Sequence, residues 1–214
     1  MQAWLDTLVV LLILTNLRLV GSSRLFACVR TVAVQGLLLG LLPVLVQWNT
    51  LTWRPALLAA GSTFLKAGVF PWLLRRAVRD VGLRREVDPV VGYSTSLLIT
   101  MGLLGVTLYL GQRLPPAGLF ESQLMTPVAI FTILVGLFLI VARRTAVMQV
   151  LGYLAMENGI YAFGMALAVE EPVLVELGIL LDVFMGVFVM GIAIFNISRE
   201  FDHIDTDRLS VLKD

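Results

Sequence analysis

The sequence predicts an all-α integral membrane protein with about seven transmembrane helices. The chain of 214 residues is 58% hydrophobic and only 14% charged, and its mean hydropathy is +0.91. A soluble domain of this length keeps more charge on its surface. A transmembrane helix needs about 20 mainly apolar residues, and such stretches take up nearly the whole chain. We place the seven helices at Trp4–Leu19, Leu25–Val46, Ala56–Leu74, Val90–Leu110, Met125–Ala142, Ala146–Ala168 and Val173–Ile197.

The basic residues predict how these helices cross the membrane. Most of the 16 lysines and arginines fall in every second loop and in the C-terminal tail. Loops rich in Lys and Arg stay in the cytoplasm, so we expect the N-terminus outside and the C-terminus in the cytoplasm. Two loops stand out, the arginine-rich stretch between the third and fourth helices and the Arg143-Arg144 turn. A role in topology explains both, and the alternative is a docking surface for a cytoplasmic partner.

The chain divides best at the loop Leu114–Gly118. The predicted segments are four N-terminal helices (1–113), three further helices (114–198) and a cytoplasmic tail (199–214), with the helices forming two sub-bundles of one domain. No basic residue precedes the first apolar stretch, so we interpret it as a retained helix and not a signal peptide. The single Cys28 and the single His203 predict neither a disulfide nor a metal site. The net charge of +1 points to no nucleic-acid partner.

Three ionisable residues lie near the middle of predicted transmembrane helices: Lys66, Glu157 and Asp182. A charge at the centre of a bilayer costs about 2.5–3.5 kcal/mol on insertion scales. Residues placed there in spite of this cost are typical of ion and proton pathways. We therefore predict a proton pathway through these helices. Glu176 lies nearer the outer end of the last helix and is a candidate for the outer entrance, or simply a carboxylate that reaches the headgroups.

Glu157 lies about 18 Å along its helix, close to the bilayer midplane. Side chains four residues apart share a helix face, so Gln149, Tyr153 and Tyr161 form one polar stripe with Glu157. Asn158 adds an amide beside the stripe. A carboxyl in this setting can exchange a proton through bridging waters. The alternative is a protonated glutamate that only forms a hydrogen bond with a neighbouring helix.

The surroundings of the other two mid-membrane residues also favour a pathway. Gly178 and Gly186 flank Asp182 on one helix face, where small residues leave room for another helix or for water. Lys66 precedes Pro71, which has no N–H and usually kinks a helix. Broken helices in membranes are tolerated where they line cavities. The alternatives are a structural hydrogen bond for the aspartate and a side chain that extends toward the headgroups for the lysine.

The C-terminal part of the chain resembles a known family. The runs IVARRTAVMQVLGYLAMENGIYAFG and LGILLDVFMGVFVMGIAIFNI and the tail DHIDTDRLSVLKD are similar to the three-helix K subunit of bacterial respiratory complex I. They are also similar to the C subunit of multi-subunit cation/proton antiporters. This resemblance covers about residues 125–214. The extra N-terminal helices and the run LGYLAMENGIY make the chain similar to hydrogenase-4 component E, a larger relative of the K subunit.

The resemblance implies a place in the bacterial inner membrane, beside antiporter-like membrane subunits and the subunits of a hydrogenase arm. It implies that [NiFe] and iron–sulfur centres are held by those partners, and we expect no cofactor in this chain. In the K subunit two buried glutamates belong to the proton path. The second falls on Asp182, while the first falls on Leu154, with Glu157 three residues later. The carboxyl of Glu157 then lies on a similar helix face, about 4.5 Å further along.

These observations together predict a membrane subunit of a hydrogenase-4-like complex, related to energy-converting [NiFe]-hydrogenases and to complex I. The chain is expected to contribute to proton translocation or coupling and to be non-catalytic by itself. The alternatives are a stand-alone ion transporter and a purely structural membrane scaffold of such a complex. The predicted proton-pathway residues are Glu157, Asp182, Lys66 and Glu176, with Tyr153, Tyr161 and Asn158 as supporting polar residues.

Overall fold

The computed structural model describes residues 2–46, 60–80, 90–113 and 123–167, which are almost entirely helical. Four helices in these ranges are long and apolar enough to cross a membrane, which confirms the predicted all-α membrane fold. The predicted helix Val173–Ile197 lies outside the described residues, so the count of seven stays a prediction. The elements are α1 (Gln2–Gly21), α2 (Leu25–Val46), the π-helical turn η1 (Leu65–Val69), α4 (Phe70–Asp80), α5 (Tyr93–Gly111), α6 (Met125–Ala142) and α7 (Ala146–Leu167).

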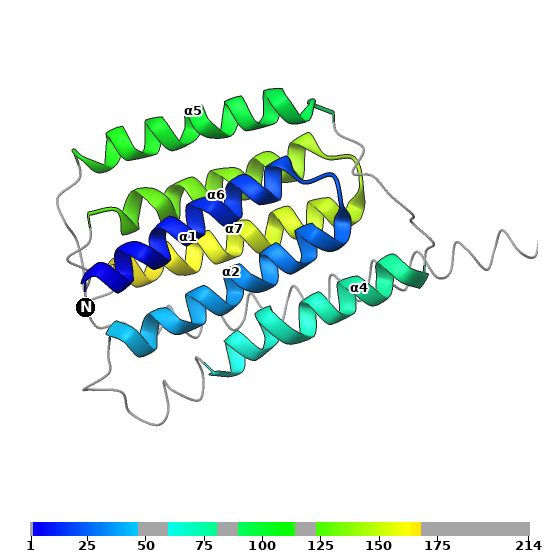
Figure 1. Ribbon diagram of the computed structural model, residues 1–214, viewed down its shortest axis with the longest axis horizontal. Helices are drawn as coiled ribbons and strands as arrows, with labels where there is room; N and C mark the ends of the chain where they lie inside the picture. Colours follow the sequence, from blue (N-terminus) through cyan, green and yellow to red (C-terminus); the bar gives the residue numbers. More distant parts are fainter. Residues whose placement is uncertain (1, 47–59, 81–89, 114–122, 168–214) are drawn as a thin grey trace, which may run out of the picture.

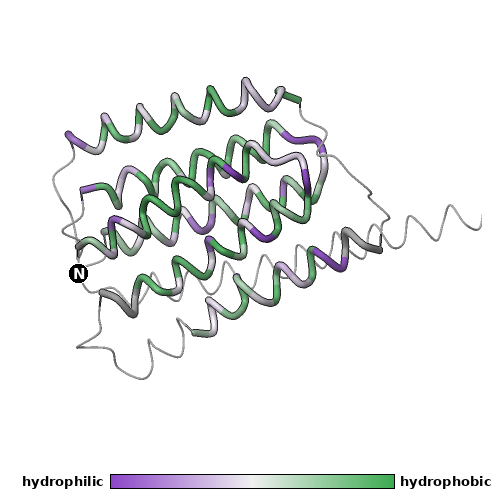
Figure 2. The backbone as a smooth tube through the Cα atoms, viewed as in Figure 1, coloured by the Kyte–Doolittle hydropathy of each residue, from purple (hydrophilic) through white to green (hydrophobic). Residues whose placement is uncertain are grey.

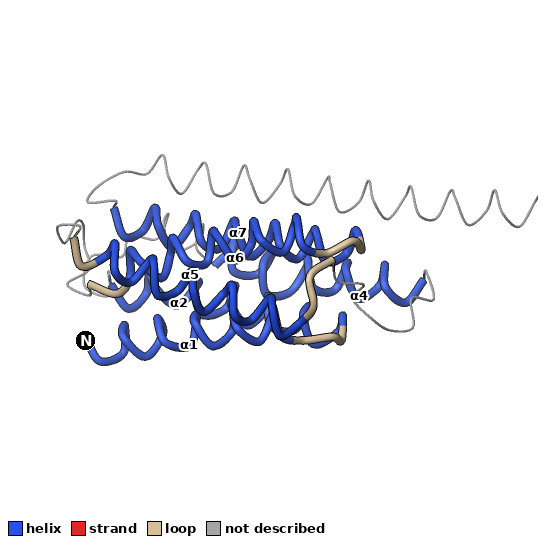
Figure 3. The backbone as a smooth tube through the Cα atoms, turned by 90° about the horizontal axis from the view of Figure 1, so that it is seen from above, coloured by secondary structure: helices blue, strands red, loops and turns tan. Residues whose placement is uncertain are grey.

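Helices α1, α2, α6 and α7 form a four-helix bundle at the centre of the molecule (Figure 1). Each of α1 and α7 packs against both α2 and α6. Helix α5 lies on one side of this bundle, against α1 and α6, and η1 with α4 lies on the other side, against α2. The end of α4 projects beyond the bundle (Figures 1 and 3). The described helices α1 and α2 of the predicted N-terminal segment therefore share one packed interior with α6 and α7 of the segment that follows it.

The buried apolar side chains of the bundle form two clusters. In α1, Leu12 belongs to one cluster and Leu19 to the other, and α2 is divided in the same way between Leu39 and Val32. Polar residues occupy the level between the clusters, and the hydrophilic colour interrupts the bundle helices at mid-length (Figure 2). We call these residues the polar layer. Its buried members are Asn16 of α1, Gln35 of α2, Thr132 of α6, and Glu157 and Asn158 of α7.

Glycines bring α6 and α7 into close contact. A Cβ atom built on Gly136 would lie 2.6 Å from the carbonyl oxygen of Gly152 and would also collide with the backbone N of Met156. A Cβ on Gly159 would lie 2.6 Å from the backbone N of Ile133. Small residues allow helix backbones to approach in this way in membranes. The neighbours are backbone atoms, which cannot rotate away, so the contact requires glycine.

Arg143 ties three elements together at one end of the bundle. Its side chain is 1% exposed, and its Nη2 and Nη1 groups donate to the carbonyl oxygens of Val20 (2.9 Å) and Val91 (3.1 Å). Its guanidinium carbon lies 5.0 Å from the centre of the Tyr93 ring. Burial lowers the pKa of Arg143, but a guanidinium stays protonated in proteins. In the sequence Arg143 and Arg144 both look like topology determinants, whereas in the structure Arg143 is a buried structural cation and Arg144 is exposed.

We predict that Gly136→Ala lowers the free energy of unfolding of the protein in detergent by about 1–3 kcal/mol, the usual range for overpacking. The control is Gly105→Ala, because a Cβ on Gly105 in α5 meets no atom within 4 Å. Denaturant titration of the two variants measures the difference. Equal stability of the two variants would contradict the close α6–α7 contact.

We predict that Arg143→Gln lowers the free energy of unfolding by about 2–4 kcal/mol, because two hydrogen bonds from a charged group are lost. Arg144→Gln should stay within about 0.5 kcal/mol of the original protein, as exposed substitutions usually do. The same denaturant titration tests both. A loss of similar size in both variants would mean that the positive charge of the turn, and not the buried contacts, stabilises it.

Candidate proton-transfer site

Lys66 lies in a helix whose backbone hydrogen bonds change register. Residues 60–64 are α-helical, Leu65–Val69 form the π-helical turn η1, and α4 continues the helix from Phe70. The N–H of Phe70 donates to the carbonyl oxygen of Leu65, five residues back. Pro71 follows directly and has no N–H to donate. The helix break expected from this proline is thus a π turn, a feature that is frequent at functional sites.

Two glycines of α2 allow the π turn to approach the bundle. A Cβ on Gly36 would lie 2.8 Å from the Cβ of Lys66, and a Cβ on Gly40 would lie 2.8 Å from the Cβ of Thr63. The two glycines are four residues apart, so they share one face of α2. This G-x-x-x-G spacing is typical of close helix contacts in membranes. It places the backbone of Lys66 directly against α2.

Lys66 and Glu157 form an ion pair inside the protein. The Nζ of Lys66 lies 3.1 Å from Oε1 of Glu157, and the two side chains are 6% and 2% exposed. The ring centre of Tyr161, one helical turn further along α7, lies 5.1 Å from the same Nζ, within the range of a cation–π contact. Opposite charges attract strongly where water is excluded, but each charge is costly there without its partner. The pair is therefore the feature of this region that a proton would perturb most.

The other predicted site residues fall in different places. Asn158 is buried in the polar layer, and Tyr153 is partly buried and packs on an apolar cluster. Gln149 does not extend the polar stripe toward Glu157, because its amide donates to the carbonyl oxygen of Arg143 at 3.2 Å, at the turn before α7. Asp182 and Glu176 lie outside the described residues. Their role in a pathway, like that of Lys66 and Glu157, stays a prediction.

The structure adds a hydrogen-bond network that was not predicted from the sequence. The Nε2 of Gln35 donates to Oδ1 of Asn16 (2.8 Å) and to Oγ1 of Thr15 (3.1 Å). The Nδ2 of Asn16 donates to Oγ1 of Thr132 (2.8 Å). The network thus joins α1, α2 and α6 at the polar layer. A signal was present in the sequence, since Asn16 and Gln35 are amides inside two otherwise apolar stretches.

These residues offer proton-exchanging and hydrogen-bonding groups. The described part of the chain holds no group of three His, Cys, Asp or Glu side chains arranged to bind a metal ion. The carboxyl of Glu157 and the amine of Lys66 can each bind and release a proton. The amides and hydroxyls of the polar layer can donate to or accept from water. This chemistry suits proton transfer within the membrane.

The fold and these residues define a multi-pass membrane protein with a buried ion pair between two helices, and comparison with known proteins gives its family. Residues 124–214 match the family of NADH-ubiquinone/plastoquinone oxidoreductase chain 4L. The chain is 36% identical to an uncharacterized protein of Mycobacterium tuberculosis over 95% of its own length and 93% of that protein. It is 29% identical to hydrogenase-4 component E of Escherichia coli and of Shigella flexneri, over 72% of each chain. No solved structure matches.

The chain therefore belongs to a hydrogenase-4 component E-like family, as the sequence resemblance predicts. The chain 4L match covers the end of the chain, including α6 and α7. Lys66 and the network residues Asn16 and Gln35 lie outside that match. The ion pair thus joins the part shared with chain 4L to the part that precedes it.

A double-mutant cycle tests the ion pair. We predict that the destabilising effects of Lys66→Met and Glu157→Gln are not additive and that the coupling energy is about 1–3 kcal/mol, as for buried groups in contact. The reference cycle combines Lys66→Met with Thr100→Val, a buried residue of α5 whose hydroxyl bonds within its own helix. That reference cycle should be additive, and additivity in both cycles would contradict the pairing.

Proposed function

We propose that the protein is a proton-translocating or coupling membrane subunit of a hydrogenase-4-like complex, and that Lys66 and Glu157 exchange protons inside it. The 3.1 Å contact between two buried, oppositely charged side chains carries this proposal. The comparisons support the setting, because the relatives of Escherichia coli and Shigella flexneri are named hydrogenase-4 component E. The chain would act in a multi-subunit complex and would not be catalytic by itself.

The pair can pass on a proton because the membrane interior disfavours net charge. With Glu157 ionised and Lys66 protonated, the pair carries no net charge. When a proton arrives at Glu157, its carboxyl becomes neutral and the ammonium of Lys66 loses its counter-ion, which is costly in a low dielectric. Lys66 then releases its own proton, so that one proton enters the pair and one leaves it. The paired state is restored when the proton of Glu157 moves to the amine of Lys66.

The π turn could link this proton exchange to a change in helix conformation. The ion pair connects α7 to η1, and a π turn has an α-helical register as its near alternative. Loss of the charge attraction would allow the turn to change register, which would move the lysine relative to Glu157. Protonation and helix conformation would thus be linked, as coupling requires. Asp182 and Glu176 are proposed as further carboxyl groups of the same path.

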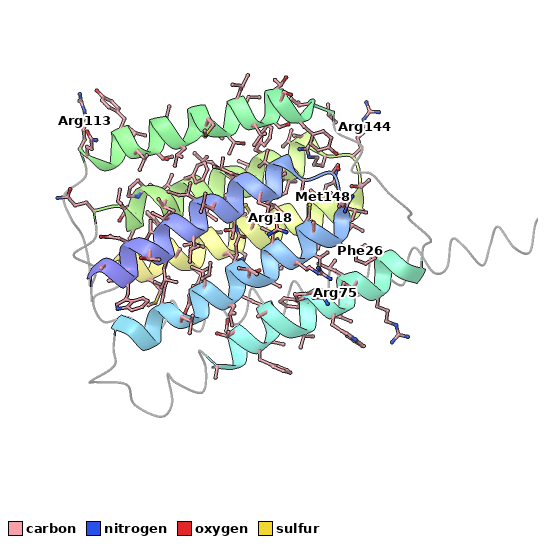
Figure 4. The ribbon with its side chains drawn as sticks, viewed as in Figure 1. Arg18, Phe26, Arg75, Arg113, Arg144 and Met148 are labelled. Atoms are coloured by element: carbon pink, nitrogen blue, oxygen red, sulfur yellow. The ribbon has the colours of Figure 1, made fainter. Side chains whose placement is uncertain are left out.

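The basic residues support a cytoplasmic location for one end of the bundle. Arg75 and Arg144 lie at the end where α6 meets α7, and Arg113 lies at the opposite end (Figure 4). By the preference of arginine for the cytoplasmic side, the N-terminus would lie outside and the C-terminus in the cytoplasm of a bacterial inner membrane. The partners would be antiporter-like membrane subunits and a hydrogenase arm. Those partners would hold the [NiFe] and iron–sulfur centres, with no cofactor in this chain.

The test is proton translocation driven by turnover in membrane vesicles that carry the whole complex. We predict that Glu157→Gln reduces translocation at least tenfold while the complex stays assembled, because an amide of the same shape cannot bind the transferred proton. The control is the double variant Glu157→Gln with Gln149→Glu, which adds a carboxyl at an exposed position of the same helix. This second substitution should not restore translocation.

Normal translocation by assembled Glu157→Gln complexes would contradict the proposal and leave the chain as a structural scaffold. Translocation by the purified chain alone in liposomes would instead identify a stand-alone transporter.

A further inference from the structure

Tyr161 places the face of its aromatic ring against the ammonium of Lys66. The Nζ of Lys66 lies over this ring, 5.1 Å from its centre. A ring face attracts a cation within about 6 Å, because the charge distribution of the ring is negative on its faces. The sequence predicts Tyr161 only as a supporting polar residue. The structure thus adds the ring itself to the groups that contact the ion pair.

The ammonium of Lys66 has both of these partners on one helix. Glu157 and Tyr161 are four residues apart in α7, so their side chains share one face. The Nζ lies 3.1 Å from Oε1 of Glu157 while it lies over the ring of Tyr161. On the α2 side the lysine has little room, since a Cβ on Gly36 would lie 2.8 Å from its Cβ. The ammonium therefore keeps the ring as a partner when the carboxylate of Glu157 is neutralised.

The surroundings of the ring strengthen its attraction for a cation. Tyr161 packs on the apolar cluster that contains Leu12 and Leu39, and Lys66 is only 6% exposed. A cation–π contact is worth more where the cation is desolvated than at an exposed site. Phe163 packs on the same cluster from the same helix and makes no cation–π contact in the described part of the chain. Packing of an aromatic ring in this cluster and contact with Lys66 are therefore separable.

The cation over Tyr161 can also change its charge. The rings of Trp72, Tyr93 and Tyr109 lie near guanidinium groups of arginine, which do not lose their proton in proteins. Lys66, in contrast, carries an amine that can bind and release a proton. The ring of Tyr161 attracts this side chain only while it is charged. The contact therefore favours one particular protonation state of the pair.

We propose that Tyr161 is a positioning residue whose ring holds the Lys66 ammonium while Glu157 carries a proton. The inference rests on the proposed function of the pair. In that exchange a proton reaches Glu157 before Lys66 releases its own, and the ammonium then lacks a counter-ion in a low dielectric. The ring stabilises this state and so lowers the barrier to proton uptake. It also keeps the lysine beside Glu157, where the amine can accept the proton that restores the pair.

Three variants in vesicles that carry the whole complex test this role. Tyr161→Leu stays apolar but has no ring, so it should lower turnover-driven proton translocation about tenfold, the effect of losing a desolvated cation–π contact. Tyr161→Phe keeps the ring and should translocate at most of the original rate. The matched control is Phe163→Leu, which removes a ring from the same helix and the same apolar cluster and should translocate normally.

A graded substitution separates the charge of the ring from its shape. Phenylalanines with an increasing number of ring fluorines, placed at position 161, keep the ring shape but lose negative charge from its face. Translocation should fall stepwise as fluorine is added, because the attraction for the ammonium weakens at each step. This series decides the case even if Tyr161→Leu does not assemble. A rate that does not depend on fluorine would overturn the inference.

The other outcomes are equally distinct. Equal losses in Tyr161→Leu and Phe163→Leu would mean that the rings only fill the cluster, and a loss in Tyr161→Phe as large as in Tyr161→Leu would mean that the hydroxyl acts instead. Either result contradicts the role of the ring. If Glu157→Gln loses translocation but Tyr161→Leu does not, the inference is wrong and the proposed function stands. If Glu157→Gln translocates normally, the proposed function itself fails.

Discussion

The ion pair between Lys66 and Glu157 is the constraint on which the account of this protein depends. Two unpaired charges buried in the bundle would each cost several kcal/mol, and a pair in contact reduces that cost only while both partners are charged. The surrounding structure positions the two side chains for this contact. The π turn sets the position of the lysine, and the glycines at 36 and 40 bring that turn against α2. Residues that precede the chain 4L match thus complete a site whose glutamate lies within it.

Polar side chains and tightly packed apolar side chains occupy different levels of the bundle. Glycines at the α6–α7 contact and the buried guanidinium of Arg143 hold the helix ends and the hairpin in place. The apolar clusters at either end exclude water, and the polar layer between them is narrow. In the function proposed above, proton transfer would be confined to this polar level. Tight packing elsewhere would prevent protons from crossing without passing the pair.

Much of this fold follows from hydropathy, and little of the site does. The bounds of α2 and α6 are those predicted, because long apolar stretches end at charged or turn-forming residues. The sequence also singles out Lys66 and Glu157 as candidates, since charge in an apolar stretch needs an explanation. The contact between them could not be predicted, because no local sequence pattern tells which helices pack against each other. For the same reason Arg143 and Arg144 look equivalent in the sequence. The network around Gln35 was not predicted, because its amides carry no charge and therefore do not stand out in an apolar stretch.

Infrared difference spectroscopy of the assembled complex in membranes tests the central claim most directly. The spectrum between high and low pH reports carboxyl groups that gain a proton. The account predicts a carboxylic C=O band that disappears in Glu157→Gln and whose pH midpoint moves in Lys66→Met, because a neighbouring ammonium favours the carboxylate and methionine cannot. A spectrum that is the same in the original protein and in both variants would contradict it, since Glu157 would then keep one protonation state throughout.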